Sequence, residues 1–196
     1  MRLVLDLRKV SSHSERCRLA SDADQHGIWG TVVTGPPGAE CVEAAAIAAV
    51  TSNLSIIVDV DGDAAHPTTL AEEVAVLDQI SRRRAALIFR GETTTKLSVV
   101  ALLSGLPSNG VILSPPPAQT SVPVFAPEDM PEVDLEGDLQ NSAAIIDQYR
   151  DANTPFLIVS WDRPIKELAR HLVGRAASPE FPQMVADLAD EIDPIE

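Results

Sequence analysis

Three side chains that could bind a ligand stand where apolar runs of the sequence end. Asp59, Arg90 and Trp161 each lie at or directly after the end of a short apolar run that predicts a buried strand. A guanidinium pairs with phosphate or carboxylate oxygens, and an indole ring stacks on flat ligands. Because the carboxyl ends of barrel strands carry binding sites, we take these three residues as candidate contacts to a bound ligand.

Each candidate also has a structural alternative that the sequence leaves open. Arg90 can pair with a nearby carboxylate such as Glu92 instead of a ligand phosphate. Trp161 and Arg163 together could stack on and neutralise a ring-bearing phosphate, but a tryptophan at a strand end is equally well placed to cap the core. No catalytic residue is assigned.

Other patterns that could carry chemistry do not complete a known motif. Asp59, Asp61 and Asp63 alternate as in a calcium loop, yet that loop requires glycine and glutamate where this chain has Ala64 and Leu70. No metal site is therefore expected here. The histidines give no recognisable catalytic triad, and the sequence has neither a GxGxxG run nor a P-loop lysine.

The helix predicted over residues 69–81 has the clearest signals in the chain. Thr69 and Glu72 form a capping box at its start, and apolar residues then recur at helical spacing. His66 stands before a proline at the entry, where we favour a structural role in shaping the loop. The arginines at 82–84 follow the helix and are expected to be solvated partners of its dipole.

Apolar runs and helical patterns alternate along the chain, which predicts a parallel sheet with helical crossovers. The fold class expected is α/β, a shortened or incomplete (β/α)8 TIM-type barrel with mostly parallel strands, since a complete barrel takes about 250 residues and this chain has 196. We treat 1–196 as one domain, with 107–138 as a proline-rich, acidic connection. The predicted strands are 3–7, 28–33, 54–60, 85–89, 111–113, 122–125 and 155–160. The predicted helices are 14–25, 40–50, 69–81, 94–103, 142–151 and 165–174.

Charge and cysteine content limit the classes of partner. The formal net charge of −14 repels phosphate backbones and anionic headgroups, so neither nucleic acid nor a membrane is an expected partner. Cys17 and Cys41 do not suggest a disulfide framework. The N-terminal apolar run is interrupted by Asp6 and Arg8, and no run approaches the length of a membrane span. We expect a cytoplasmic protein.

Several segments, in a fixed order along the chain, match motifs of a known family. Together they cover about half of the sequence, mainly from residue 19 to residue 91. They make the chain similar to the bacterial-luciferase-like flavin- or deazaflavin-dependent oxidoreductases. The matching segments are Ala20–Trp29, Glu43–Thr51, Leu54–Val58, His66-Pro67, Leu77–Ser81, and Pro115–Gln119 followed by Val122–Val124.

The chain departs from the family pattern around the fourth strand. The family has Ser-Gly-Gly-Arg before this strand and Gly-x-Gly after it, whereas this sequence has Ser81 to Arg84 and then Phe89, Arg90 and Gly91. Glycines let a cofactor approach the backbone closely. If Phe89 and Arg90 point into the barrel, they should obstruct that approach.

The resemblance implies an oxidoreductase of the monooxygenase type that uses FMN or the deazaflavin F420, with catalysis reduced or lost at the altered strand end. Asp59, Arg90 and Trp161 are the residues expected to contact the cofactor. The alternative is a protein without turnover, either a flavin-binding protein or a partner subunit of a full-length luciferase-like chain, with no cofactor of its own required. Family members commonly dimerise, so a homodimer or heterodimer with such a chain is expected.

Overall fold

Parallel strands form a single curved sheet in the part of the chain that the structure, a computed structural model, describes, residues 1–36, 39–135 and 139–169. The order of the seven strands in the sheet is β5-β4-β3-β2-β1-β7-β6, and every adjacent pair is parallel. The strands are β1 (Arg2–Asp6), β2 (Gly30–Val33), β3 (Ser55–Asp61), β4 (Ala85–Arg90), β5 (Val124–Phe125), β6 (Glu132–Asp134) and β7 (Phe156–Ser160).

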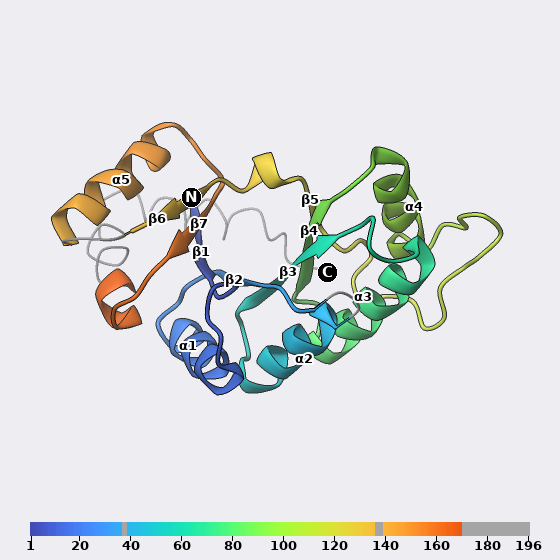
Figure 1. Ribbon diagram of the computed structural model, residues 1–196, viewed down its shortest axis with the longest axis horizontal. Coiled ribbons are helices and arrows are strands. Elements are labelled where there is room, and N and C mark those ends of the chain that lie inside the picture. The colour runs from blue at the N-terminus through green and yellow to red at the C-terminus, as the bar shows by residue number, and fades with distance from the viewer. Residues whose placement is uncertain (37–38, 136–138, 170–196) are drawn as a thin grey trace, which may run out of the picture.

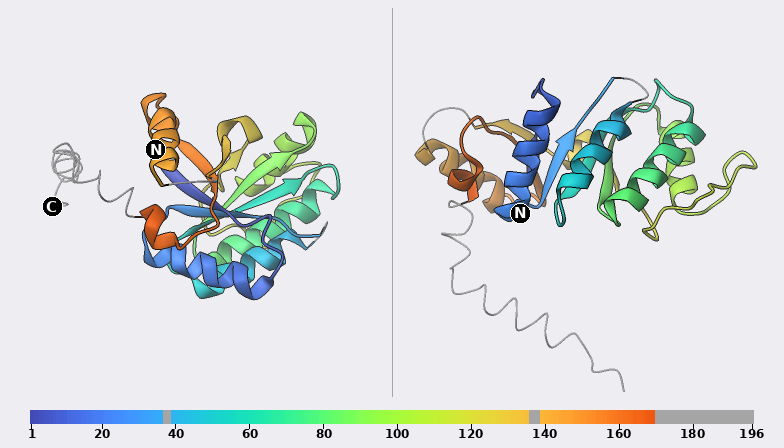
Figure 2. Two further views of the ribbon diagram at one scale, coloured as in Figure 1. Left: turned by 60° about the vertical axis from the view of Figure 1, so that its left-hand side comes forward. Right: turned by 90° about the horizontal axis from the view of Figure 1, so that it is seen from below.

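Helices cover the outer face of this sheet (Figures 1 and 2). They are α1 (His13–Gln25), α2 (Glu40–Val50), α3 (Pro67–Ser81), α4 (Thr93–Leu103) and α5 (Leu139–Asp151), with a short 3-10 helix η1 (Pro127–Asp129). Residues 165–169 are helical, and the rest of the helix predicted to residue 174 lies outside the described residues. None of the described helices is long and apolar enough to cross a membrane.

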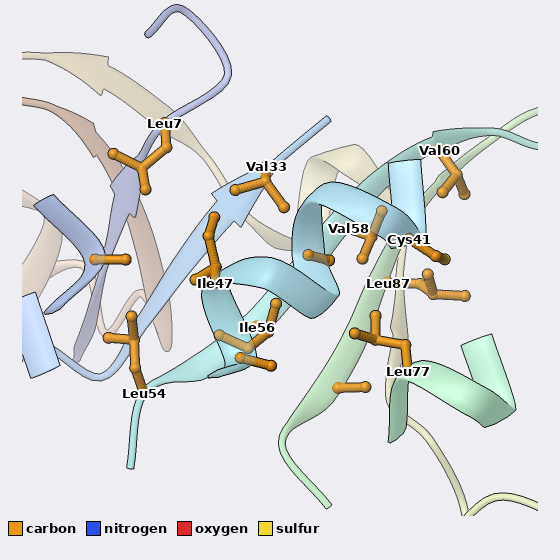
Figure 3. Close-up of a cluster of buried hydrophobic side chains, with 14 of the residues drawn as sticks. Leu7, Val33, Cys41, Ile47, Leu54, Ile56, Val58, Val60, Leu77 and Leu87 are labelled. Atoms are coloured by element: carbon orange, nitrogen blue, oxygen red, sulfur yellow. The ribbon is translucent and has the colours of Figure 1, made fainter. Parts of the chain in front are cut away.

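The main core lies between the outer face of the sheet and the helices (Figure 3). Ile47 of α2 and Leu77 of α3 pack there against outward-pointing strand residues such as Ile56, Val58 and Leu87. Strands that are covered on both faces read as continuous apolar runs, which is why the sequence predicts them well.

The barrel is open between β5 and β6. These two strands are the edges of the sheet, and an eight-stranded barrel would place one more strand between them. Instead, the chain passes directly from β5 to β6 through η1, which spans the opening in Figure 1. The expected incomplete barrel is therefore confirmed, and the missing unit belongs to the middle of the chain.

A small apolar cluster fills the inside of the curved sheet. Met130, which follows η1, is fully buried in this cluster and occupies the interior beside the gap. The buried side chains of the cluster come from the inner faces of five strands and from the η1 connection, and they are Val4, Val32, Ile57, Ala86, Ile88, Met130 and Ile158. Three partly buried aromatic side chains pack against them, Trp29, Phe125 and Phe156. The interior is thus a packed core rather than a channel.

Two strand predictions differ from the structure. The predicted strand 111–113 is wrong, because Val111 makes only an isolated bridge to Ser108 within a loop. Conversely, β6 lies in the segment that was expected to be an acidic connection. Its residues alternate, with Glu132 on the inner face and Val133 packed against the outer core. The sequence did not predict this strand, because it is three residues long and lies in an acidic segment.

Helix α3 begins at Pro67, two residues before the predicted range of 69–81, because its N-cap lies three residues before Thr69. His66 is the N-cap, and its Nδ1 accepts a hydrogen bond from the Thr68 amide at 3.3 Å. Pro67 then occupies the first helical position, where its missing N–H costs nothing. The cap assigned to Thr69 is wrong, whereas the structural role favoured for His66 is confirmed.

The basic turn after α3 is not simply a solvated group. Arg82 and Arg83 adopt left-handed backbone conformations, with φ of 58° and 68°, at the positions where the family has two glycines. Arg84 is half-buried and donates hydrogen bonds to the carbonyl oxygens of Ala48, Thr51 and other residues at the base of the sheet. Arg84 does contact the end of α3, since its Nε donates to the Ser81 carbonyl, but the prediction that it is solvated is wrong, because its half-buried guanidinium also binds the carbonyls of Ala48 in α2 and of Leu54 before β3.

Candidate functional site

Polar side chains replace apolar ones at the carboxyl end of the inner face. Side chains alternate along a strand, so Asp59 shares the inner face with Ile57, and Arg90 shares it with Ile88. Asp6 stands at the end of β1 by the same rule. Together with Arg8 and Glu132 they form what we call the ion-pair cluster: Asp6, Arg8, Asp59, Arg90 and Glu132.

Arg8 is the centre of the ion-pair cluster. Its Nε and Nη2 donate to the two carboxylate oxygens of Asp6 at 3.0 and 2.9 Å. Its Nη1 donates to Asp59 Oδ2 at 2.5 Å, and Nη1 and Nη2 contact the carboxylate of Glu132 at 2.9 and 2.8 Å. One guanidinium therefore joins β1, β3 and the edge strand β6.

Arg90 pairs with the same carboxylates from the other side. Its Nε and Nη2 donate to Asp59 at 2.7 and 3.1 Å, and Nη2 also donates to Glu132 at 3.3 Å. The side chain of Asp59 is only 9% exposed, whereas Glu132 and Arg90 are nearly half exposed. Asp59 and Arg90, two of the predicted contacts, are thus brought together and satisfy each other.

The ion-pair cluster holds both arginines firmly in their charged form. Burial alone would lower the pKa of Arg8, but the hydrogen bonds that it donates to Asp6, Glu132 and Asp59 outweigh this effect and raise that pKa. The pKa of Arg90 is raised mainly by its hydrogen bonds to Asp59. Because each carboxylate of the cluster is engaged by a guanidinium, none can act as a general base without first breaking an ion pair.

Trp161 lies apart from this cluster. Its ring packs in the outer core, its Nε1 donates to the Pro164 carbonyl at 3.3 Å, and the guanidinium of Arg163 stacks over it at 5.4 Å. The core-cap alternative therefore describes its packing. Phe89 also points outward, into the main core and over Gly62, so it does not obstruct the barrel interior. Of the two residues expected to obstruct, only Arg90 faces inward.

A cavity of about 560 Å³ opens beside Trp161, at the carboxyl ends of β1 and β7. Trp161 and Leu19 contribute apolar walls, and the charged lining is mixed, with the cations Lys9, Arg18 and Arg163 beside the carboxylates Asp6, Glu15, Asp22 and Asp162. Lys9 pairs with Asp134 at 3.0 Å, and Arg18 pairs with Glu15. All four of these side chains are exposed, so the pairs lie at the rim of the cavity. Asp6 borders both the cavity and the ion-pair cluster, so the two features are neighbours.

Sequence reasoning missed Arg8, Lys9 and Glu132. Arg8 and Lys9 follow β1 at its carboxyl end, so the rule that selected Arg90 could also have selected them. Glu132 gave no such signal, because the strand that carries it is three residues long and reads as acidic loop.

Comparison with known proteins supports the fold and leaves the reaction open. No family model and no curated protein matches the sequence. Among solved structures, the chain is similar to the monooxygenase RslO1 from Streptomyces bottropensis, with 16% identity and a TM-score of 0.56, over 97% of this chain and 80% of that one.

Two further solved structures show the same likeness. One is the oxygenating constituent of 3,6-diketocamphane monooxygenase from Pseudomonas putida, in complex with FMN, with 13% identity and a TM-score of 0.55 over 90% of this chain and 61% of that one. The other is EDTA monooxygenase from Chelativorans sp. BNC1, with 14% identity and a TM-score of 0.52 over 98% of this chain and 70% of that one. The chain has the fold of these monooxygenases, and it is the fold that the luciferase-like resemblance implies.

Proposed function

We propose that this protein is a luciferase-like flavin-dependent oxidoreductase in kind, which binds FMN or a deazaflavin beside Trp161 and has reduced or no turnover. The observation that carries the proposal is the cavity of about 560 Å³ at the strand ends of a barrel with this fold. Its volume lies within the roughly 300–1,000 Å³ of typical small-molecule sites.

The residues around the cavity suit a flavin. Trp161 supplies an aromatic wall, and Lys9, Arg18 and Arg163 would bind a phosphate by exchanging their present carboxylate partners for it. A bound flavin would contribute the redox chemistry, and the protein would contribute binding and orientation. Asp59 and Arg90 act from the neighbouring ion-pair cluster and set the polarity of the barrel mouth.

Reduced turnover follows from how the barrel mouth is filled. Met130 packs the interior and the ion-pair cluster occupies the inner strand ends, so a reactant has little room to approach a flavin from inside the barrel. The carboxylates that could move a proton are held by Arg8 and Arg90. We therefore expect this protein to bind a flavin and to show little or no turnover.

A visible absorption spectrum of the purified protein, followed by titration with FMN and with a deazaflavin, tests this proposal. We expect one of the two cofactors to bind saturably. Quenching of tryptophan fluorescence measures this binding. Turnover measured with reduced cofactor should be slow. A colourless protein that binds neither cofactor would overturn the flavin proposal.

The second candidate function, a partner subunit, is favoured by an exposed apolar face. Helices α2 and α3 leave a shallow hollow of about 390 Å³ between them, which is almost entirely apolar. Val42, Val76 and Ile80 are exposed around it. We propose this face for association with a second copy or with a full-length luciferase-like chain.

Sedimentation of the wild type and of a Val76→Asp variant tests the partner-subunit candidate. A partner subunit should form a dimer, alone or with a co-purified luciferase-like chain, and V76D should dissociate it. If the wild-type protein is monomeric and no luciferase-like chain co-purifies with it, the partner-subunit proposal is wrong.

A further inference from the structure

The three carboxylates of the ion-pair cluster are not equivalent. Asp6 and Asp59 are buried, and each receives two hydrogen bonds from one arginine, Arg8 and Arg90 respectively. Glu132 is 45% exposed, comes from the opposite edge of the open barrel, and is shared by both arginines. It is the outermost member of the cluster.

The charges divide in the same way. Arg8 and Arg90 neutralise Asp6 and Asp59, so these four side chains form a fixed group without net charge. Their remaining outward donors converge on the carboxylate of Glu132, at 2.8 and 2.9 Å from Arg8 and 3.3 Å from Arg90. Arg8 contacts both oxygens of Glu132 with two nitrogens, which is the bidentate geometry by which arginine recognises carboxylates.

Glu132 is not needed to hold its own strand in place. The backbone of β6 pairs with β7, and the flanking amides of Ile158 and Leu135 donate to Pro131 and Ser160 carbonyls at 2.9 and 3.1 Å. The side chain can therefore leave the arginines while the strand stays paired. An incoming anion can reach the half-exposed Arg90 from solvent, and it gains access to the more buried Arg8 once the exposed Glu132 side chain has moved away.

We propose that Arg8 and Arg90 form a binding site for small-molecule carboxylates at the barrel mouth, and that Glu132 is its internal occupant. A ligand carboxylate takes the place of the Glu132 carboxylate on the two guanidiniums, and Asp6 and Asp59 keep those guanidiniums oriented. This site goes beyond the proposed flavin binding and does not depend on it, because it uses the inner strand ends and not the wall formed by Trp161.

Removal of the internal occupant provides the test. Sodium malonate is titrated calorimetrically, at constant ionic strength, into the wild-type full chain and into its Glu132→Gln and Glu132→Ala variants. We expect both variants to bind malonate at least about tenfold more tightly than the wild type, since no internal carboxylate competes. Arg90→Ala in the E132A background should abolish this gain.

Asp134→Asn is the matched control. It removes one negative charge from the same strand but leaves Arg8 and Arg90 untouched, since Asp134 pairs with Lys9. D134N should bind malonate like the wild type. An equal gain in D134N and E132Q, or a gain that survives R90A, would show that only general charge matters and would overturn the proposal.

Two further outcomes are decisive. Inorganic phosphate, titrated in parallel, should bind the E132Q variant more weakly than malonate, and tighter phosphate binding would contradict the assigned ligand class. Circular dichroism and thermal unfolding monitor the fold. If neither Glu132 variant unfolds cooperatively, Glu132 is a structural clamp across the barrel gap and the exchange proposal fails.

Discussion

The carboxylate of Asp59 accepts two hydrogen bonds from the guanidinium of Arg90, at 2.7 and 3.1 Å, across the inner face of an open barrel. Both side chains stand at strand ends, where a barrel of this kind binds its ligand. They are instead bound to each other, and Asp59 also accepts a hydrogen bond from Arg8. The barrel mouth therefore carries a set of internal ion pairs, and the open cavity lies to one side, next to Trp161.

The two arginines of the ion-pair cluster should differ in their contribution to stability. Arg8 is 13% exposed and is, among the described residues, the only arginine paired with the buried Asp6, so Arg8→Ala leaves that carboxylate without a guanidinium partner and should cost about 3–5 kcal/mol. Arg90 is nearly half exposed, and Arg90→Ala leaves Asp59 paired with Arg8, so we expect about 1 kcal/mol. Urea unfolding of both variants measures the difference. Equal losses would contradict the central position of Arg8.

The basic turn after α3 should respond in opposite directions to substitution. Arg82→Gly and Arg83→Gly should each stabilise the protein by about 0.5–1 kcal/mol, because glycine adopts the left-handed conformation without strain. Arg84→Ala should cost at least about 2 kcal/mol, because it leaves carbonyl oxygens at the base of the sheet without a hydrogen-bond donor. Thermal unfolding of the three variants checks the signs. A destabilised R82G or R83G would show that the arginine side chains, and not the backbone geometry, matter.

Two of the segments that resemble the luciferase-like family, Leu77–Ser81 and Pro115–Gln119, are joined by a pair of hydrogen bonds. Asp78 of α3 accepts from the backbone and the side-chain amide of Gln119, both at 2.7 Å, and the Asp78 side chain is inaccessible to water. Gln119→Ala should therefore cost about 1–3 kcal/mol. Gln79→Ala is the matched control, since Gln79 is exposed and loses a single bond to the Pro116 carbonyl. Equal losses of stability in Q119A and Q79A, measured by urea unfolding, would contradict the contribution assigned to the Asp78–Gln119 hydrogen bonds.

Acid should weaken the packing of α1 against α2 through Glu43. Burial alone would raise the pKa of Glu43, but hydrogen bonds from Arg16 and His13 outweigh it and lower that pKa below 4.5. A carboxyl whose folded pKa is depressed adds stability above its unfolded pKa and loses it as the pH falls through the folded value.

The stability difference between wild type and Glu43→Gln should therefore be largest above about pH 5 and shrink toward pH 3. Urea unfolding at a series of pH values measures it. Glu15→Gln, which breaks an exposed pair with Arg18, is the control and should show a smaller difference. A difference for E43Q that grows in acid would contradict the assigned ion pair.

The sequence predicted the strands and helices of the first half well, for a physical reason. Strands such as β3 are covered on both faces and carry unbroken apolar runs, and α3 has a clear periodicity. The second half was harder, because β5 and β6 are only two and three residues long. Their place in the sheet depends on pairing with distant strands, which composition does not encode.

The candidate site was predictable only in part. Strand-end position selected Asp59 and Arg90, and the structure places them together because parallel strands bring their carboxyl ends to one edge, but their contact with a cofactor stays a prediction. Their partner Glu132 reaches the cluster across the gap, and no local signal marks such a contact. Trp161 also ends a strand, yet its ring faces the outer core, since an offset of one residue in a strand reverses the face.

The affinity for FMN of the wild type and of two arginine variants tests the central claim most directly. Arg163 stacks on Trp161 at the cavity, whereas Arg150 pairs with Asp147 on α5 and does not line it. We predict that Arg163→Ala weakens FMN binding about tenfold or more, and that Arg150→Ala leaves it unchanged. Equal affinities in the wild type, R163A and R150A would contradict a flavin site beside Trp161.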